Sequence, residues 1–122
     1  MREIKFRAWD KEKKEMIYFG IYDTDEGYLI QKQIFLDCLP IMQYTGLHDR
    51  RGKDIYFGDI VMDADLGRYK MVVDEVWVAN KIIEINNGNN ATGAIGIIGN
   101  IYESPALFAQ SFFAANRQTI RH

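Results

Sequence analysis

The chain has 122 residues, a length typical of a single domain with one hydrophobic core. Hydrophobic residues make up 48% and charged residues 26%, a composition that argues against disorder. The net charge of −2 argues against a non-specific nucleic-acid binder, because neutralised phosphates supply most of the affinity of such proteins. We therefore expect one globular domain over residues 1–122.

The first elements form a predicted hairpin. Ile4–Ala8 alternates between apolar and charged residues, which indicates a half-buried strand. The charged turn Asp10–Lys14 leads into a second strand at Met16–Phe19. Because this start has no apolar segment and no run in the chain is long enough to span a bilayer, we expect neither secretion nor membrane association.

The next segment mixes turns with short apolar runs. A turn is predicted at Asp23–Gly27, and Ile34–Leu39 fits either a short helix or a strand that ends at Pro40. Ile41–Tyr44 then reads as a strand. Cys38, which has no second cysteine to pair with, is expected to be a small buried residue in a reducing compartment.

The second half of the chain is predicted to be rich in strands. Ile60–Met62, Tyr69–Val78 and Ile82–Ile85 carry the β-branched and aromatic residues that strands favour. In Tyr69–Val78 the apolar face changes near Asp74-Glu75, which predicts a β-bulge or a twist.

The C-terminal part is predicted to hold the last strands and the one helix. The Asn- and Gly-rich loop Asn86–Gly93 is followed by predicted strands at Ile95–Ile98 and Ile101-Tyr102. Ser104-Pro105 is a typical helix start, with Ser as the N-cap and Pro at the first helical position. Many short strands with one late helix favour a small barrel or barrel-like sheet.

The most informative segment is Thr45–Val61. Its glycines lie six residues apart, and each is expected at a backbone position with positive φ; they are Gly46, Gly52 and Gly58. Asp49–Gly52 predicts a type I turn, and the carboxylate of Asp59 is expected to accept backbone N–H groups in the turn before the next strand.

Three blocks of residues resemble the YopX family of phage and prophage proteins. They are Ile4–Asp10, Ile98–Leu107 and the central Tyr44-Thr45-Gly46-Leu47-x-Asp49-x-x-Gly52-Lys53-x-Ile55-Tyr56-x-Gly58-Asp59-Ile60-Val61. Phe57 departs from the family pattern, which usually has an acidic residue there. The resemblance implies a mainly β fold: a small SH3-like barrel element with additional strands and a short C-terminal helix. It also implies a phage or prophage gene expressed in the bacterial cytoplasm, and it carries over no activity and no catalytic residue.

Two local clusters are candidates for a functional site. His48, Asp49 and Asp59 are the residue types of a small metal-dependent hydrolase, although turn-forming Asp residues and an exposed His explain them more simply. Arg50, Arg51 and Lys53, with His48 beside them, form a basic loop tip that could bind nucleic acid near Arg7, Tyr44 and Tyr56.

The leading hypothesis is a non-enzymatic accessory protein that works by binding or assembly. No cofactor or metal is expected, because no catalytic constellation accompanies the turn motif. We expect a homo-oligomer with an unidentified phage or host protein as partner. The aromatic tail could supply a self-association face through Phe108, Phe112 and Phe113.

Overall fold

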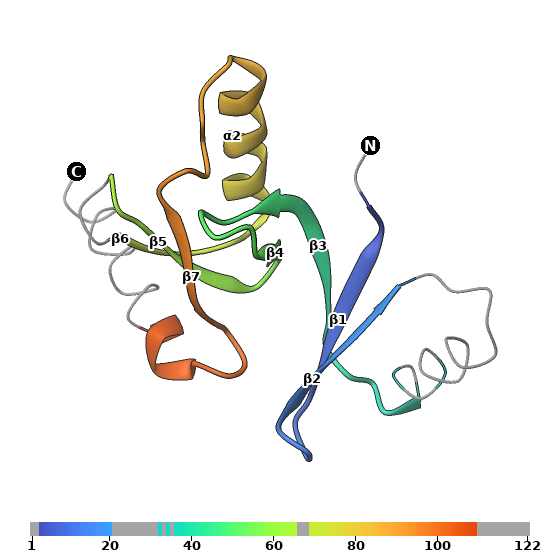
Figure 1. Cartoon of the computed structure of the whole chain (residues 1–122). Coiled ribbons are helices and arrows are strands. Elements are labelled where there is room, and N and C mark those ends of the chain that lie inside the picture. Colours follow the sequence, from blue (N-terminus) through green and yellow to red (C-terminus); the bar gives the residue numbers. More distant parts are fainter. Residues whose placement is uncertain (1–2, 21–31, 33, 35, 66–68, 110–122) are drawn as a thin grey trace.

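The computed structural model describes residues 3–20, 32, 34, 36–65 and 69–109. Two antiparallel sheets make up most of it, with strand orders β2-β1-β3-β4 and β6-β5-β7, and a helix lies between β6 and β7 in the chain (Figure 1). The elements are β1 (Lys5–Asp10), β2 (Glu15–Gly20), β3 (Ile41–His48), β4 (Asp54–Tyr56), β5 (Asp59–Asp63), β6 (Tyr69–Val72), α2 (Glu75–Asn86) and β7 (Ile95–Asn100).

The predicted N-terminal hairpin is confirmed. β1 pairs with β2 so that Phe6 lies opposite Phe19 and Ala8 opposite Ile17. These four residues are on one face of the sheet and form a small core with Ile34. The alternation in Ile4–Ala8 therefore marks the covered face correctly.

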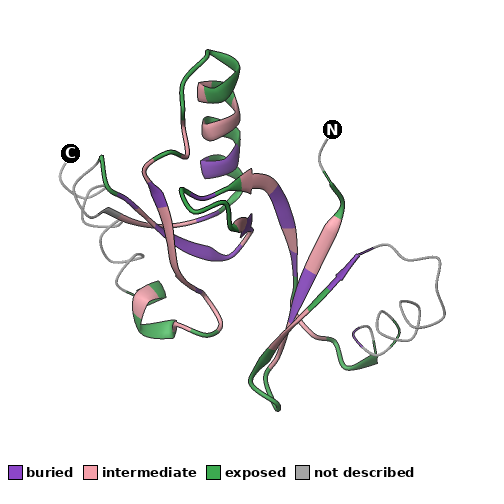
Figure 2. Cartoon of the chain, in the orientation of Figure 1, coloured by how far each residue is buried: buried purple, intermediate pink, exposed green. Residues whose placement is uncertain are grey.

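A second and larger core lies inside the barrel element. Strands β3 to β7 curl around Ile55, Val61, Val73, Trp77, Val78 and Ile95. Figure 2 shows buried residues along β5 and in the first turn of α2, whereas the rest of α2 is partly or fully exposed. The mainly β fold with a small SH3-like barrel element, expected from the sequence, is the observed one.

The predicted strands at Tyr69–Val78 and Ile82–Ile85 are wrong in part. β6 ends at Val72, and α2 occupies residues 75–86. The carboxylate of Asp74 accepts the backbone N–H of Trp77 at 2.8 Å, so Asp74 is a helix N-cap. The change of apolar face at Asp74-Glu75 therefore marks a helix start and not a bulge.

The end of α2 agrees better with the sequence. The N–H of Asn87 bonds to the carbonyls of Ile83 and Glu84, and Gly88 follows with a φ of +85°. The Asn87-Gly88 pair, which lies within the predicted loop Asn86–Gly93, is thus the C-terminal stop of a helix.

Two further corrections concern the ends of short elements. Cys38 is exposed and has a φ of +52°, in the turn after helical backbone at residues 32, 34 and 36, so it is not the buried residue expected. Ile101-Tyr102 is a turn, because the side-chain oxygen of Asn100 accepts the N–H groups of Tyr102 and Glu103.

The predicted helix start at Ser104-Pro105 is confirmed for residues 105–109, where the N–H of Phe108 bonds to the carbonyl of Ser104. The predicted turn at Asp23–Gly27 and the chain after residue 109, with Phe112 and Phe113, lie outside the described residues. Among the helices that the structure describes, none has the length and apolar character needed to cross a membrane.

Candidate binding site

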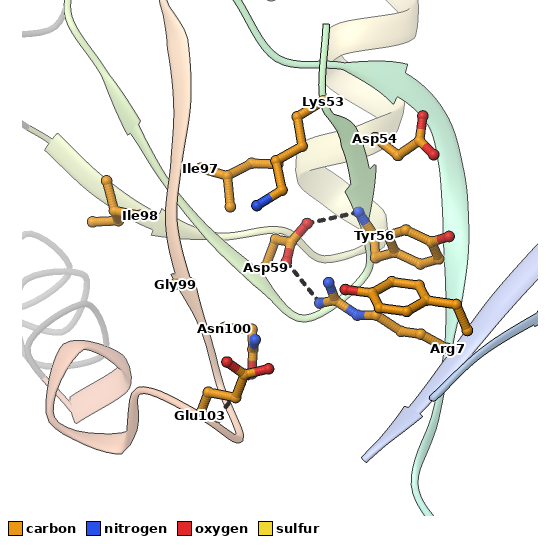
Figure 3. A pocket seen from close by; sticks show the side chains of 11 residues that line it. Arg7, Lys53, Asp54, Tyr56, Asp59, Ile97, Ile98, Gly99, Asn100 and Glu103 are labelled. Carbon is orange, nitrogen blue, oxygen red and sulfur yellow. Dashed lines mark hydrogen bonds and ion pairs between the residues drawn. The ribbon is translucent and has the colours of Figure 1, made fainter. Parts of the chain in front are cut away.

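A pocket of about 450 Å³ lies between the two sheets (Figure 3). One wall comes from β1, β2 and β4, and the other from β5 and the end of β7. Its lining residues are Arg7, Tyr18, Lys53, Asp54, Tyr56, Asp59, Ile97, Ile98, Gly99, Asn100 and Glu103. The pocket is therefore built from segments that are far apart in the sequence and meet only in the folded chain.

A buried ion pair crosses between the walls. Nη2 of Arg7 donates to Oδ1 of Asp59 at 2.6 Å, and the two side chains are 6% and 2% exposed. The other oxygen of Asp59 accepts the N–H of Tyr56 at 2.8 Å. The expected backbone bond to Asp59 is thus confirmed, and the pairing with Arg7 is a second role that the sequence did not indicate.

Burial controls the ionisation of Asp59. Loss of solvent raises the pKa of the Asp59 carboxyl above its usual range, although the charge of Arg7 and the bond from Tyr56 oppose that effect. An ion pair with so little access to water depends on close geometry to offset its lost hydration.

Aromatic rings surround the guanidinium of Arg7. It lies over the ring of Tyr56 at 4.7 Å, and the ring of Tyr18 meets that of Tyr56 edge-on at 5.7 Å. Tyr18 is 59% exposed and forms an outer edge of the pocket. Nε of Arg7 is buried and has no hydrogen-bond partner in the described part of the chain.

Arg7 reaches this place through strand register. It lies opposite Tyr18 on β2 and Met42 on β3, on the face of the sheet away from Phe6 and Ala8. The alternation of β1 places Arg7 on the face opposite Phe6 and Ala8, and the sequence predicted that it lies near the basic loop and Tyr56, whose ring it contacts. Local periodicity does not predict that the second sheet packs against that face. Tyr18, the aromatic residue opposite Arg7 in the predicted hairpin, was a usable signal that Arg7 is not simply solvated.

Lys53 and Glu103 bring opposite charges to the pocket. Figure 3 shows them toward opposite ends of it, with Arg7 and Asp59 between. Neither side chain forms an ion pair within the described residues, whereas Asp54 is held by Lys5 at 2.6 Å. The hydrogen bond between Lys5 and Asp54 raises the pKa of Lys5 to about 12. Because Lys53 has no ion-pair partner among the described residues, it is the cation of the pocket that is free to meet a ligand.

The residues of the basic loop have different surroundings. Of its predicted binding residues only Lys53 lines the pocket. Arg50 lies across Gly96 of β7, where a Cβ would meet its Nε at 3.5 Å, and Arg51 is exposed. His48 is exposed and bonds to the hydroxyl of Tyr44 at 3.0 Å and to Asp54 at 3.1 Å.

The residues of the hydrolase hypothesis have separate partners. The carboxylate of Asp49 accepts the N–H groups of Arg51, Lys53 and Ile97. Burial would raise the pKa of Asp49, but these bonds outweigh it and hold the pKa below its usual range. His48 is held by Tyr44 and Asp54, and Asp59 by Arg7 and Tyr56. No three His, Cys, Asp or Glu residues in the described ranges are arranged to hold a metal ion.

The turn scaffold agrees with the sequence. Gly46, Gly52 and Gly58 have φ values of +85°, +81° and +90°. The N–H of Gly52 bonds to the carbonyl of Asp49, as the predicted turn requires. Gly58 is more constrained, because its N–H bonds to Val73 and its carbonyl accepts the N–H of Ile101.

Substitution of the two turn glycines is expected to have unequal effects. Gly58→Ala should lower the free energy of unfolding by about 2–3 kcal/mol, since it adds left-handed strain and a contact 3.0 Å from Sδ of Met42. Gly52→Ala is the control, because nothing lies within 4 Å of its new Cβ, and it should cost only about 1 kcal/mol. Urea unfolding measures both, and equal costs would contradict the assigned constraint.

The fold and the pocket define a mainly β protein with an SH3-like barrel element and a polar cavity between its two sheets. The chain belongs to the YopX family: the family model described as "YopX protein" matches residues 5–109. No curated protein is a significant match. Among solved structures, the crystal structure of protein EF1440 from Enterococcus faecalis is similar, with 22% identity and a TM-score of 0.50 over 88% of this chain and 99% of that one. This similarity supports the fold.

Proposed function

We propose that the protein is a binding module that holds a ligand in the pocket between its sheets. The observation that carries the proposal is the polar pocket itself, whose wall holds the Arg7–Asp59 ion pair, the exposed ring of Tyr18 and the ammonium group of Lys53.

The ligand carries an anionic group next to an apolar or planar part. Lys53 supplies a cation without an ion-pair partner among the described residues, and Tyr18 supplies an exposed ring. A carboxylate fits better than a chain of phosphates, since Asp54, Asp59 and Glu103 also line the pocket and would repel repeated negative charge. Nucleic-acid binding through residues 50–53 is the alternative; of these residues only Lys53 lines the pocket.

Binding is proposed in place of catalysis and fits an accessory role in a phage or prophage, which the family resemblance implies. The partner is a phage or host protein of the bacterial cytoplasm. Homo-oligomerisation remains a prediction, which light scattering of the full chain would test.

Selection of peptides tests the proposal. We expect the full chain to enrich acidic members of a random library of seven-residue peptides, whereas oligothymidylate of ten nucleotides does not bind. A selected peptide should shift the NMR signals of Gly99 and of the Arg7 Nε–H, and Lys53→Glu should weaken it about tenfold or more.

Lys13→Glu is the matched control, since Lys13 is an exposed lysine of the β1–β2 turn and does not line the pocket. It should leave the affinity unchanged. If neither the selected peptides nor the oligonucleotide perturbs the pocket signals, the proposed function is wrong. Binding of the oligonucleotide alone would establish the nucleic-acid alternative.

A further inference from the structure

Most of the charge that lines the pocket is neutralised within the chain. Its charged lining residues are Arg7, Lys53, Asp54, Asp59 and Glu103. Arg7 is paired with Asp59 at 2.6 Å, and Asp54 is held by Lys5 of β1, also at 2.6 Å. Because the members of a close pair cancel each other's field, these side chains attract neither a cation nor an anion strongly.

Lys53 and Glu103 carry the charges that remain. Neither takes part in an ion pair within the described residues. The ammonium group of Lys53 does act on the pocket wall: burial raises the pKa of the Asp59 carboxyl, and the charges of Arg7 and, more weakly, of Lys53 oppose that rise. Figure 3 shows Lys53 and Glu103 toward opposite ends of the pocket, so a ligand meets a cation at one end and an anion at the other.

Both residues project from backbone that the chain holds in place. The N–H of Lys53 donates to the carboxylate of Asp49 at 2.9 Å, and its carbonyl accepts the N–H of Asp49 at the same distance. The N–H of Glu103 donates to Oδ1 of the buried Asn100 at 2.8 Å. Since fixed attachment points reduce the ordering needed on binding, a ligand whose two charges match their separation is favoured over one with another spacing.

The wall between the two charges is largely apolar and aromatic. Ile97 and Ile98 of β7 line one side, and the exposed ring of Tyr18 lines the other, next to the guanidinium of Arg7 stacked on Tyr56. Such a surface suits a short apolar spacer, because apolar contact supplies affinity while the charges at the ends fix the orientation.

We propose that the pocket binds a dipolar peptide segment of a partner protein, with an acidic side chain on Lys53, a basic side chain on Glu103 and small apolar residues between them. This inference rests on the proposed binding function and adds to its ligand a cationic group at a fixed distance from the carboxylate. A segment with two like charges is disfavoured, because one end of it meets a pocket residue of its own sign.

A series of synthetic peptides tests the spacing. Each peptide carries one aspartate and one arginine separated by zero to five alanines, with both termini blocked, and its affinity for the full chain is measured by NMR titration. We expect one spacing to bind best. Replacement of its aspartate by asparagine, or of its arginine by glutamine, should weaken that peptide about tenfold or more.

Charge reversal in the pocket tests the two ends. Lys53→Glu and Glu103→Lys should each weaken the best peptide about tenfold, and Lys13→Glu should leave its affinity unchanged. The double variant Lys53→Glu with Glu103→Lys should bind it to within about threefold of the unsubstituted chain, because the exchanged charges accept the peptide turned end for end.

The opposite response of Glu103 separates this inference from the proposed function. If Glu103→Lys strengthens the binding of acidic peptides and the arginine is dispensable, the ligand is only anionic, so the dipolar segment is wrong while the binding function stands. The same holds if peptides selected from the library shift the pocket signals and no spacing in the series binds better than the others. If neither kind of peptide shifts these signals, both proposals are wrong.

Discussion

Arg7→Met is expected to lower the free energy of unfolding by about 3–5 kcal/mol at neutral pH, as measured by urea unfolding. Methionine replaces the apolar stem of the Arg7 side chain but not its guanidinium. The carboxylate of Asp59 is therefore left buried without its cation. Since Asp59 is only 2% exposed, water solvates its carboxylate poorly once the partner is lost. The cost follows from an uncompensated buried charge and not from lost volume.

The same variant should show an altered dependence on pH. The pKa of Asp59 is already raised by burial, and removal of the Arg7 charge that opposes this effect raises it further. A carboxyl with a higher pKa in the folded state binds its proton more tightly there than in the unfolded chain. The stability that the Asp59 carboxyl contributes is therefore fully present below the pKa that it has in the unfolded chain. This stability is lost as the pH rises through the pKa that it has in the folded protein. The deficit of Arg7→Met relative to the unsubstituted chain should shrink as the pH is lowered.

The double variant Arg7→Met with Asp59→Asn separates charge from shape. The amide introduced at position 59 is neutral, and its oxygen can still accept the N–H of Tyr56 that the carboxylate holds now. We expect the double variant to recover at least about half of the loss and to be nearly independent of pH between about 4 and 7. A single variant that costs less than about 1 kcal/mol would show that Asp59 is hydrated in solution.

The sequence predicted those features of the fold that depend on a few neighbouring residues. The alternation of Ile4–Ala8 located the β1–β2 hairpin, and the spaced glycines Gly52 and Gly58 located two turns with positive φ. The face to which a strand residue points and the backbone freedom of a glycine are local properties. They depend on neighbouring residues and not on the rest of the fold, so the sequence predicts them.

The helix α2 was missed because its signals also fit strands. Val76, Val78, Ile82 and Ile83 are β-branched, which favours extended backbone. The decision for a helix depends on the cap at Asp74 and on burial of the first turn in the barrel core. Core packing overrides propensity here, and the N-cap was present in the sequence but interpreted as a bulge.

The site was predicted less well than the fold for a similar reason. Lys53 was among the expected binding residues and does line the pocket, whereas Tyr18 was not considered for binding. Arg7 was expected near the basic loop, but its pairing with Asp59 depends on 51 intervening residues that bring the two sheets together. No local pattern encodes that contact.

Trp77→Ala is expected to be the other substitution with a large effect, lowering the free energy of unfolding by about 3–5 kcal/mol. Trp77 and Val78 in the first turn are the buried residues of α2, and Ile82 one turn further on packs against the same core. The Trp77 ring belongs to the core that contains Ile55, Val61 and Ile95. Its removal leaves a cavity that this rigid strand framework cannot close.

Two controls distinguish packing from the loss of polar groups. Nε1 of Trp77 is buried without a hydrogen-bond partner among the described residues, so Trp77→Phe removes an unsatisfied donor together with some volume and should cost less than about 1.5 kcal/mol. Val76 is the neighbouring residue on α2 and is 69% exposed. Val76→Ala should therefore change the stability by less than about 0.5 kcal/mol.

Amide hydrogen exchange shows where the stability of Trp77→Ala is lost. Because Trp77 shares one core with the barrel strands, we expect faster exchange at Ile60 and Val61 of β5 as well as along α2. Faster exchange confined to α2 would mean that the helix docks on the barrel as a separate unit. The barrel would then be stable without the helix, and the core that Trp77 shares with Ile55, Val61 and Ile95 would not couple the two.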